Sequence, residues 1–216
     1  MRVAMTRLRF IATLLLLFAC SATARDDRPR GTAGVFDYYV LSLSWSPEYC
    51  ATTRRSNEQQ CARPYAFVAH GLWPQHERGW PADCESRERV SDATINRLLP
   101  IMPSRGLIIH EWRKHGTCSG LGADGYFAAL ERSYRAIRIP DRYQRLPETM
   151  VVAASDLRRE LLAANPSIKP AGLVLQCSGR YLQEVRICLD RSYGSRACGS
   201  DLRDRCGDRV VLRPVR

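Results

Sequence analysis

Several common sequence patterns are missing from this chain, and each absence narrows its class. No two cysteines stand in a C-x-x-C pair, so the usual zinc-ribbon arrangement is excluded. No internal repeat, low-complexity stretch or linker-like segment follows residue 34, so a single domain is expected over 35–216. The one long apolar run, at 10–20, is too short to span a bilayer comfortably.

The apolar run has the surroundings of an export signal. Three arginines precede it, and the small residues at 22–24 offer a cleavage site. We therefore predict a signal peptide at 1–24, followed by a flexible leader at 25–34, which is polar and contains Gly and Pro. One alternative remains open, because "LFAC" loosely resembles a lipoprotein processing box in which Cys20 would carry the lipid.

Export also accounts for the cysteine content. The chain has nine cysteines, and removal of the signal with Cys20 leaves eight, an even number. Four disulfides are therefore expected in an oxidising compartment, either periplasmic or extracellular. Sequence alone permits many pairings, but closure of short loops favours Cys50–Cys61 and Cys188–Cys198.

The chain is basic, with 33 Lys+Arg against 22 Asp+Glu. The predicted signal holds three arginines and no acidic residue, which leaves 30 against 22 and a net charge of about +8 for the remainder. Such a charge suits a polyanionic partner through release of counterions. Because arginine greatly outnumbers lysine, the same charge is equally typical of a basic protein from an arginine-rich proteome, so charge alone assigns no partner.

Strands, then helices, then strands again follow one another along the chain. Runs rich in β-branched, aromatic and leucine residues predict strands at 35–46, 65–74, 171–177, 181–189 and 209–214. Caps and apolar residues at helical spacing predict helices at 91–102, 106–116, 124–137 and 155–165. Pro47 is expected to end the first strand, and Gly71 and Pro74 to break the second. The order predicts an α+β domain with a mainly antiparallel β-sheet flanked by several helices.

The segment "HEWRKHGTC" at 110–118 concentrates groups that carry protons and charge. His110 and His115 are five residues apart and diverge by about 140° on a helix, so they cannot easily share one metal ion. Glu111 and His115 are four apart, and so are His110 and Lys114. The spacing thus pairs a carboxylate with an imidazole and an imidazole with an ammonium, which suits proton transfer and anion binding. The alternative is a solvated helix face with ordinary i,i+4 charge pairs.

A second histidine lies in the segment "FVAHGLWP" at 67–74. His70 ends an apolar strand, Gly71 permits a close approach of backbone or ligand, and Trp73 offers a rigid aromatic surface. A lone histidine at a strand end is more often structural. Together with the cluster at 110–118, however, it supplies the parts for two-histidine acid–base chemistry. His76 is interpreted as a surface histidine.

Two of these segments resemble a known family. "FVAHGLWPQ" at 67–75 and "IHEWRKHGTC" at 109–118 resemble the two active-site segments of the ribonuclease T2 family, which are secreted, metal-independent endoribonucleases. The likeness extends to "FDYYVLSLSWSPEYC" at 36–50 and "GLVLQCSGRYLQEVRIC" at 172–188, so it covers nearly all of 36–212. The resemblance implies an α+β fold in which an antiparallel sheet backs the cleft.

The same resemblance implies the remaining disulfides and the roles of the site residues. Cys84–Cys118 would tie the two active-site segments together, and Cys177–Cys206 would lie near the C-terminus. Gln75 stands where several members carry an acidic residue that contacts a base, so base preference stays open. Carried over by motif position, the catalytic residues would be His70, Glu111 and His115. The substrate-binding residues would be His110, Lys114 and Trp73.

The implied activity is cleavage of single-stranded RNA through a 2′,3′-cyclic phosphate to 3′-phosphate ends. His115 would take the proton of the 2′-hydroxyl and His70 would protonate the leaving group, although sequence cannot exclude the exchanged roles. No metal or cofactor is expected, the partner is RNA, and the exported chain should be a monomer without stable membrane insertion. Two alternatives remain open: a disulfide-bonded binding protein on this fold, and a phosphoesterase for small cyclic nucleotides.

Overall fold

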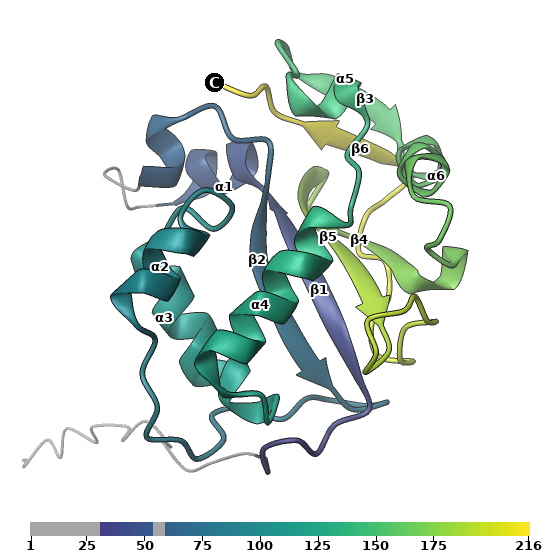
Figure 1. Ribbon diagram of the computed structural model, residues 1–216. Coiled ribbons are helices and arrows are strands. Elements are labelled where there is room, and N and C mark those ends of the chain that lie inside the picture. The colour runs from purple at the N-terminus through teal and green to yellow at the C-terminus, as the bar shows by residue number, and fades with distance from the viewer. Residues whose placement is uncertain (1–30, 54–58) are drawn as a thin grey trace, which may run out of the picture.

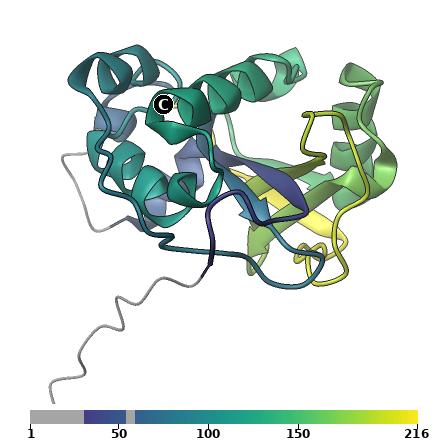
Figure 2. The same cartoon turned by 60° about the horizontal axis from the view of Figure 1, so that its bottom comes forward.

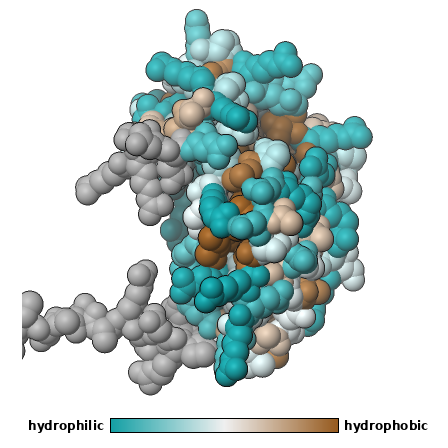
Figure 3. Space-filling view, turned by 60° about the vertical axis from the view of Figure 1, so that its left-hand side comes forward, coloured by the Kyte–Doolittle hydropathy of each residue, from teal (hydrophilic) through white to brown (hydrophobic). Residues whose placement is uncertain are grey.

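The computed structural model describes residues 31–53 and 59–216. The predicted signal peptide, Cys20 and residues 25–30 of the predicted leader lie outside these described residues. Within them, no helix combines the length and apolar character needed to cross a membrane. Hydrophilic side chains cover most of the face that carries the helices α2 and α3, and hydrophobic ones show there as small patches (Figure 3).

Strands and helices alternate in blocks along the described chain. The strands are β1 (Tyr38–Trp45), β2 (Phe67–Gln75), β3 (Met150–Ala153), β4 (Leu173–Ser178), β5 (Tyr181–Leu189) and β6 (Arg209–Leu212). The α-helices are α1 (Ser46–Thr52), α2 (Asp92–Leu98), α3 (Arg105–Lys114), α4 (Gly122–Arg135), α5 (Asp141–Gln144) and α6 (Ala154–Ala164). Short 3-10 turns are η1 (Gln59–Ala62), η2 (Gly116–Cys118) and η3 (Pro170–Gly172).

The six strands form one sheet in the order β2-β1-β5-β6-β3, with β4 also paired to β5. All pairs are antiparallel except β5 with β6. Helices α3 and α4 pack on the β2–β1 half of the sheet, and α6 packs on β3 and β4 (Figures 1 and 2). The predicted α+β class with a mainly antiparallel sheet is confirmed.

The two faces of the sheet differ in chemistry. Leu41, Leu43 and Trp45 of β1 join apolar side chains of the helices in one buried cluster. Burial of side chains of this size contributes roughly 1.5–3 kcal/mol each. Because successive residues of a strand point to opposite faces, the intervening Ser42 and Ser44 belong to the other face. The sheet therefore has an apolar face under the helices and a face with polar positions, on which the site forms.

A β-bulge interrupts the pairing of β1 with β2. Ser42 pairs with Gly71, but the next residue, Leu43, pairs with Ala69, so His70 is an extra residue in β2. The expectation that Gly71 and Pro74 break this strand is wrong, since β2 continues to Gln75. Proline is tolerated there because β2 is an edge strand, which needs no second row of ladder bonds.

The helix boundaries follow local chemistry. Ser91 accepts a hydrogen bond from the backbone of Thr94 and begins α2, as its position predicted. Pro47 ends β1 as expected, but it also lies in the first turn of α1, where its missing N–H costs nothing. Helix α1 was not predicted from the sequence, and neither were the short elements α5 and β3, which offer too few residues for a periodic signal.

Four disulfides join the cysteine pairs that the sequence analysis expected. Cys84–Cys118 ties the segment after β2 to η2, which directly follows α3. The backbone N–H of Gly34, the last residue of the predicted leader, donates to the carbonyl oxygen of Cys118. These bonds anchor the chain that follows α3 to the segment after β2 and to the residues before β1. The other three pairs are Cys50–Cys61, Cys177–Cys206 and Cys188–Cys198.

Replacing both cysteines of the Cys84–Cys118 bridge by alanine should lower the free energy of unfolding by about 4 kcal/mol, because the bridge restricts the unfolded chain over a separation of 34 residues. The same change at Cys188–Cys198, with a separation of 10 residues, should cost about 3 kcal/mol. Urea unfolding followed by circular dichroism measures both losses. A larger loss at the shorter loop would contradict the expectation.

Candidate active site

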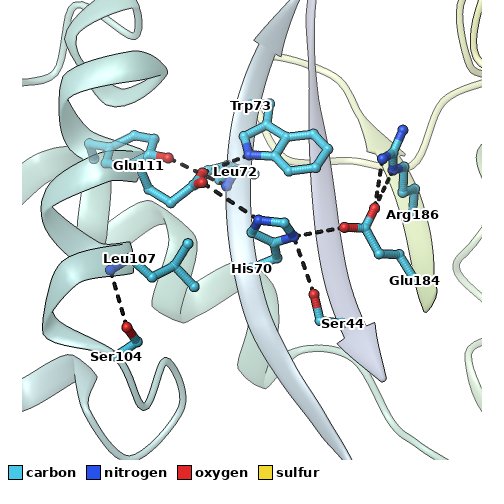
Figure 4. A network of polar contacts seen from close by, with 10 residues as sticks. Ser44, His70, Leu72, Trp73, Ser104, Leu107, Glu111, Glu184 and Arg186 are labelled. Atoms are coloured by element: carbon cyan, nitrogen blue, oxygen red, sulfur yellow. Dashed lines mark hydrogen bonds and ion pairs between the residues drawn. The ribbon is translucent and has the colours of Figure 1, made fainter. Parts of the chain in front are cut away.

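The bulge decides which face His70 occupies. Ala69 and Leu72 are fully buried in the core under the helices. Strict alternation backwards from Leu72 would direct His70 into that core. The extra residue resets the alternation, so His70 lies on the face of Ser44 and keeps a side chain that is 30% exposed (Figure 4).

One nitrogen of His70 is fixed by the neighbouring strands. Its Nδ1 lies 2.7 Å from Oε1 of Glu184 in β5 and 3.2 Å from Oγ of Ser44 in β1 (Figure 4). Burial raises the pKa of Glu184, but its hydrogen bond to His70 and the charges of His70 and Arg186 outweigh burial and bring it to about 2. Because Glu184 is therefore an anion at neutral pH, Nδ1–H of His70 donates to it. The remaining nitrogen, Nε2, is the one that faces α3.

Glu111 of α3 faces that second nitrogen. Its Oε1 lies 3.7 Å from Nε2 of His70, and its Oε2 accepts a hydrogen bond of 2.7 Å from Nε1 of Trp73. The side chain is only 2% exposed, and burial raises the pKa of Glu111 to about 7 although the charge of His70 and the Trp73 bond act against this. Helical spacing had paired Glu111 with His115. Within the described chain its carboxylate instead contacts Trp73 and His70.

His115 leaves the helical path because α3 ends at Lys114. It is the C-cap, with φ −119°, and its backbone N–H still donates to the carbonyl oxygen of Glu111. Its ring is buried, and the ring centroid lies 5.4 Å from that of Trp73. The centroid of His70 lies 5.2 Å from the same indole. The end of the helix and the bulge in the strand thus bring both imidazoles against one tryptophan.

The environments of the two histidines push their pKa values apart. Burial lowers the pKa of His70, but the hydrogen bond to Glu184 and the charges of Glu184 and Glu111 raise it above its ordinary value. Burial, together with positive charge of which Lys114 is the largest source, lowers the pKa of His115 to about 3. These opposite shifts favour a proton on His70 and its absence from His115, which is the division that paired acid–base catalysis requires.

Arg186 closes the arrangement on the side of β5. Its guanidinium lies 2.6 Å from Oε2 of Glu184 and stands over the ring of Trp73, with 5.0 Å between the guanidinium carbon and the ring centroid. A continuous chain of contacts therefore runs from Trp73 through Arg186, Glu184, His70 and Glu111 back to Trp73. Each member limits the freedom of its neighbours, so the site is held rigid before any ligand binds.

Two cavities adjoin the histidines. One, of about 310 Å³, is lined by residues that include Trp73, Lys114 and His115. The other, of about 490 Å³, is lined by residues that include His70 and His110. Both fall in the size range of ordinary small-molecule sites. A chain-like ligand with units on both sides of the histidine pair would therefore find room for each unit.

The structure places most residues singled out from the sequence at this site. His70, Trp73, Glu111 and His115 make direct contacts, and Lys114 lines the first cavity. His110 is exposed on the second cavity, and Gln75 lines the first. His76 stands apart, 39% exposed and 3.8 Å from Asp37. No group of three or more His, Cys, Asp or Glu able to hold a metal ion occurs in 31–53 or 59–216.

Three further residues of the site were missed by sequence reasoning. Glu184 and Arg186 occupy alternate positions of β5 between buried apolar residues, so a charged pair within an apolar strand was the available signal. Trp80 lines the first cavity and is 55% exposed, which is unusual for so large an apolar side chain. No periodic pattern marked it, because it lies in the loop after β2.

Comparison with known proteins gives a consistent family. A model of the ribonuclease T2 family matches residues 36–198. The chain is 37% identical over 198 residues to a ribonuclease of Aeromonas hydrophila, which covers 87% of this chain and 90% of that protein. A solved structure of an RNase-related protein from Calystegia sepium matches with a TM-score of 0.67 and 23% identity, over 84% of this chain and 98% of that one. A variant of RNase MC1 in complex with 5′-UMP matches with a TM-score of 0.65 and 22% identity, over 81% and 97%.

Gly71→Ala should damage the site without disturbing the fold. A Cβ at Gly71 would lie 2.1 Å from Oε2 of Glu111 and 2.3 Å from Nε1 of Trp73, so the carboxylate must move and its bond to the indole must break. We expect kcat/KM on RNA to fall at least about tenfold, which corresponds to about 1.4 kcal/mol of transition-state stabilisation. Gly207→Ala, which meets nothing within 4 Å, is the matched control. Equal activity of the two variants would refute the inferred role of the Glu111–Trp73 bond.

Proposed function

Because this chain belongs to the ribonuclease T2 family and is an RNA-cleaving enzyme, we propose that it cuts single-stranded RNA by transphosphorylation with His70 and His115 as the proton carriers. The observation that carries the proposal is the pair of imidazoles against one indole with opposite pKa shifts. The RNA itself supplies the nucleophile, its 2′-hydroxyl. The protein has to move two protons and offset charge on the phosphate.

His115 is proposed as the general base. Its lowered pKa leaves it neutral and able to accept a proton over the whole neutral range. Its Nδ1 is buried and has no hydrogen-bond partner within 31–53 and 59–216, so Nε2 is the nitrogen that would take the proton of the 2′-hydroxyl. The resulting 2′-oxygen attacks phosphorus and forms the 2′,3′-cyclic phosphate.

His70 is proposed as the general acid. Nδ1–H is engaged by Glu184, so only Nε2–H can pass a proton to the departing 5′-oxygen. The raised pKa of His70 favours the protonated ring that a general acid needs. In a second step the roles reverse: His70 accepts a proton from water, the water oxygen attacks phosphorus, and His115 returns its proton to the 2′-oxygen, which leaves a 3′-phosphate.

The remaining site residues are proposed to support these transfers. Glu111 faces Nε2 of His70 and would help to hold this ring cationic, rather than orient His115. Lys114 and His110, on either side of the histidine pair, would offset charge that develops on the non-bridging oxygens. Trp73 would contact a ribose or base. A relative of the same fold is solved with 5′-UMP, which supports a nucleotide as the ligand class.

Polymeric RNA is favoured over a small cyclic nucleotide because cavities lie on both sides of the reacting centre. A pure binding role is less well supported, since a binding site has no need for two histidines in opposite protonation states. Four disulfides support a periplasmic or extracellular location. The signal peptide, the monomeric state and independence from metal remain predictions.

His70→Gln and His115→Gln should each lower kcat on single-stranded RNA by about 10²- to 10⁴-fold, because each removes one proton carrier. Turnover is measured with a chelator present, on an oligonucleotide with one cleavable position and on its analogue with a 2′-deoxyribose there. The analogue should resist the unchanged enzyme.

His76→Gln serves as the matched control, since His76 is a surface histidine that pairs with Asp37. It should keep full activity. The mechanism would be contradicted by full activity of His70→Gln or His115→Gln, or by ready cutting of the deoxy analogue. It would also be contradicted if the chelator abolished activity and zinc restored it.

Glu184→Gln should move the alkaline limb of the pH–rate profile to lower pH. This limb reports loss of the proton from His70, and Glu184 raises the pKa of that histidine. With glutamine at position 184, burial and the charge of Arg186 still lower the pKa of His70, and only Glu111 still raises it. The loss of kcat should therefore be smallest at acidic pH. Profiles of kcat between about pH 4 and pH 9 test this. A uniform loss at all pH values would indicate a merely structural role.

A further inference from the structure

The loop between β5 and β6 places positive charge at the first cavity. The proposed chemistry does not use this charge. Arg203 and Arg205 line this cavity together with Lys114 and Arg186, while Asp201 is the one acidic residue of its lining. Both arginines of the loop are exposed. Four cations against one anion give a strongly positive wall next to His115.

The two loop arginines differ from Arg186 in how their charge is used. Arg186 is paired with Glu184. Arg203 donates from Nε to the carbonyl oxygen of Ser200, which leaves its terminal nitrogens to other partners, and the side chain of Arg205 has no partner in the described ranges. Within 31–53 and 59–216 neither arginine forms an ion pair with a carboxylate, so their charge is available to a ligand.

The loop that carries these arginines is held firmly. The backbone N–H of Arg205 donates to the carbonyl oxygen of Leu175, and the side chain of Gln176 donates to the carbonyl oxygen of Arg203. Asp204 accepts from the backbone N–H of Leu175, and Cys206 is bonded to Cys177. The segment runs beside β4 at the edge of the sheet (Figures 1 and 2). Its arginines are thus presented at a fixed distance from the catalytic face, which reduces the entropic cost of binding.

The direction of the RNA follows from the proposed function, on which this inference rests. His115, the proposed base, lines the first cavity, and His70, the proposed acid, lines the second. The nucleotide that supplies the 2′-hydroxyl must then lie on the side of the first cavity, and the leaving nucleotide on the side of the second. The next phosphate beyond the first nucleotide is the one on its 5′-oxygen.

We propose that Arg203 and Arg205 form a second phosphate site, which binds the phosphodiester on the 5′ side of the nucleotide whose 2′-hydroxyl attacks. Guanidinium groups match phosphate oxygens in geometry and charge. The enzyme therefore favours substrates that continue in the 5′ direction, and a dinucleotide that carries a 5′-phosphate is its smallest well-bound substrate.

Three dinucleotides test the site: UpA, pUpA with a 5′-phosphate, and UpAp with a 3′-phosphate. With the unchanged enzyme, KM should be about tenfold lower for pUpA than for UpA, as expected for a charge-assisted contact, and UpAp should resemble UpA. In the double variant Arg203→Ala/Arg205→Ala the KM values for pUpA and UpA should become equal. On polymeric RNA the slope of log kcat/KM against log salt should weaken by about 0.7, one phosphate contact.

Arg145→Ala/Arg159→Ala removes the same charge from exposed positions that do not line the cavity and is the matched control. It should keep the full advantage of pUpA. An advantage for UpAp instead of pUpA, equal loss in the control, or no advantage for either phosphate would overturn the proposal. Normal cleavage of UpA in that case leaves the proposed function intact, whereas failure to cleave UpA at all with the unchanged enzyme counts against the function itself.

Discussion

The site depends on one extra residue in β2. The bulge at His70 directs the imidazole away from the apolar core and onto the face of Ser44 and Glu184, which both contact its Nδ1. A regular strand with the same sequence would bury that ring among apolar side chains and leave Glu184 paired with Arg186 alone. The disruption of the ladder is small, because it leaves a single residue unpaired. The strand then presents a histidine whose Nδ1 is bound to Glu184 and whose Nε2 faces Glu111.

The second constraint is the point at which α3 stops. Glu111 is still helical and projects toward the strand, whereas His115 is the cap and turns its ring to the indole of Trp73. Cys118 follows directly and is bonded to Cys84, so the chain after the helix is anchored to the segment after β2. Strand and helix ends therefore meet at Trp73, which bonds Glu111 through its nitrogen and contacts both imidazoles through its ring.

The sequence predicted the elements with strong periodicity and the residues of the two motifs. It could not predict the bulge, because a bulge is a property of pairing between two strands and not of either alone. For the same reason it assigned the partner of Glu111 from helical spacing, although tertiary packing directs this carboxylate to Trp73 and His70. Glu184 escaped notice because it lies 114 residues after His70 in the chain. Its contact exists only once β5 pairs with β1.

The assignment of acid and base also comes from tertiary structure. The two histidines have the same intrinsic chemistry, and no local pattern distinguishes them. Glu184 of β5 and Glu111 of α3 lie next to His70, whereas the buried His115 at the end of α3 lies near Lys114. The two histidines also line different cavities, His115 the first and His70 the second. Under the proposed mechanism an RNA strand binds productively in one direction only, because a reversed strand would place its leaving oxygen next to His115, whose lowered pKa leaves it without a proton to donate.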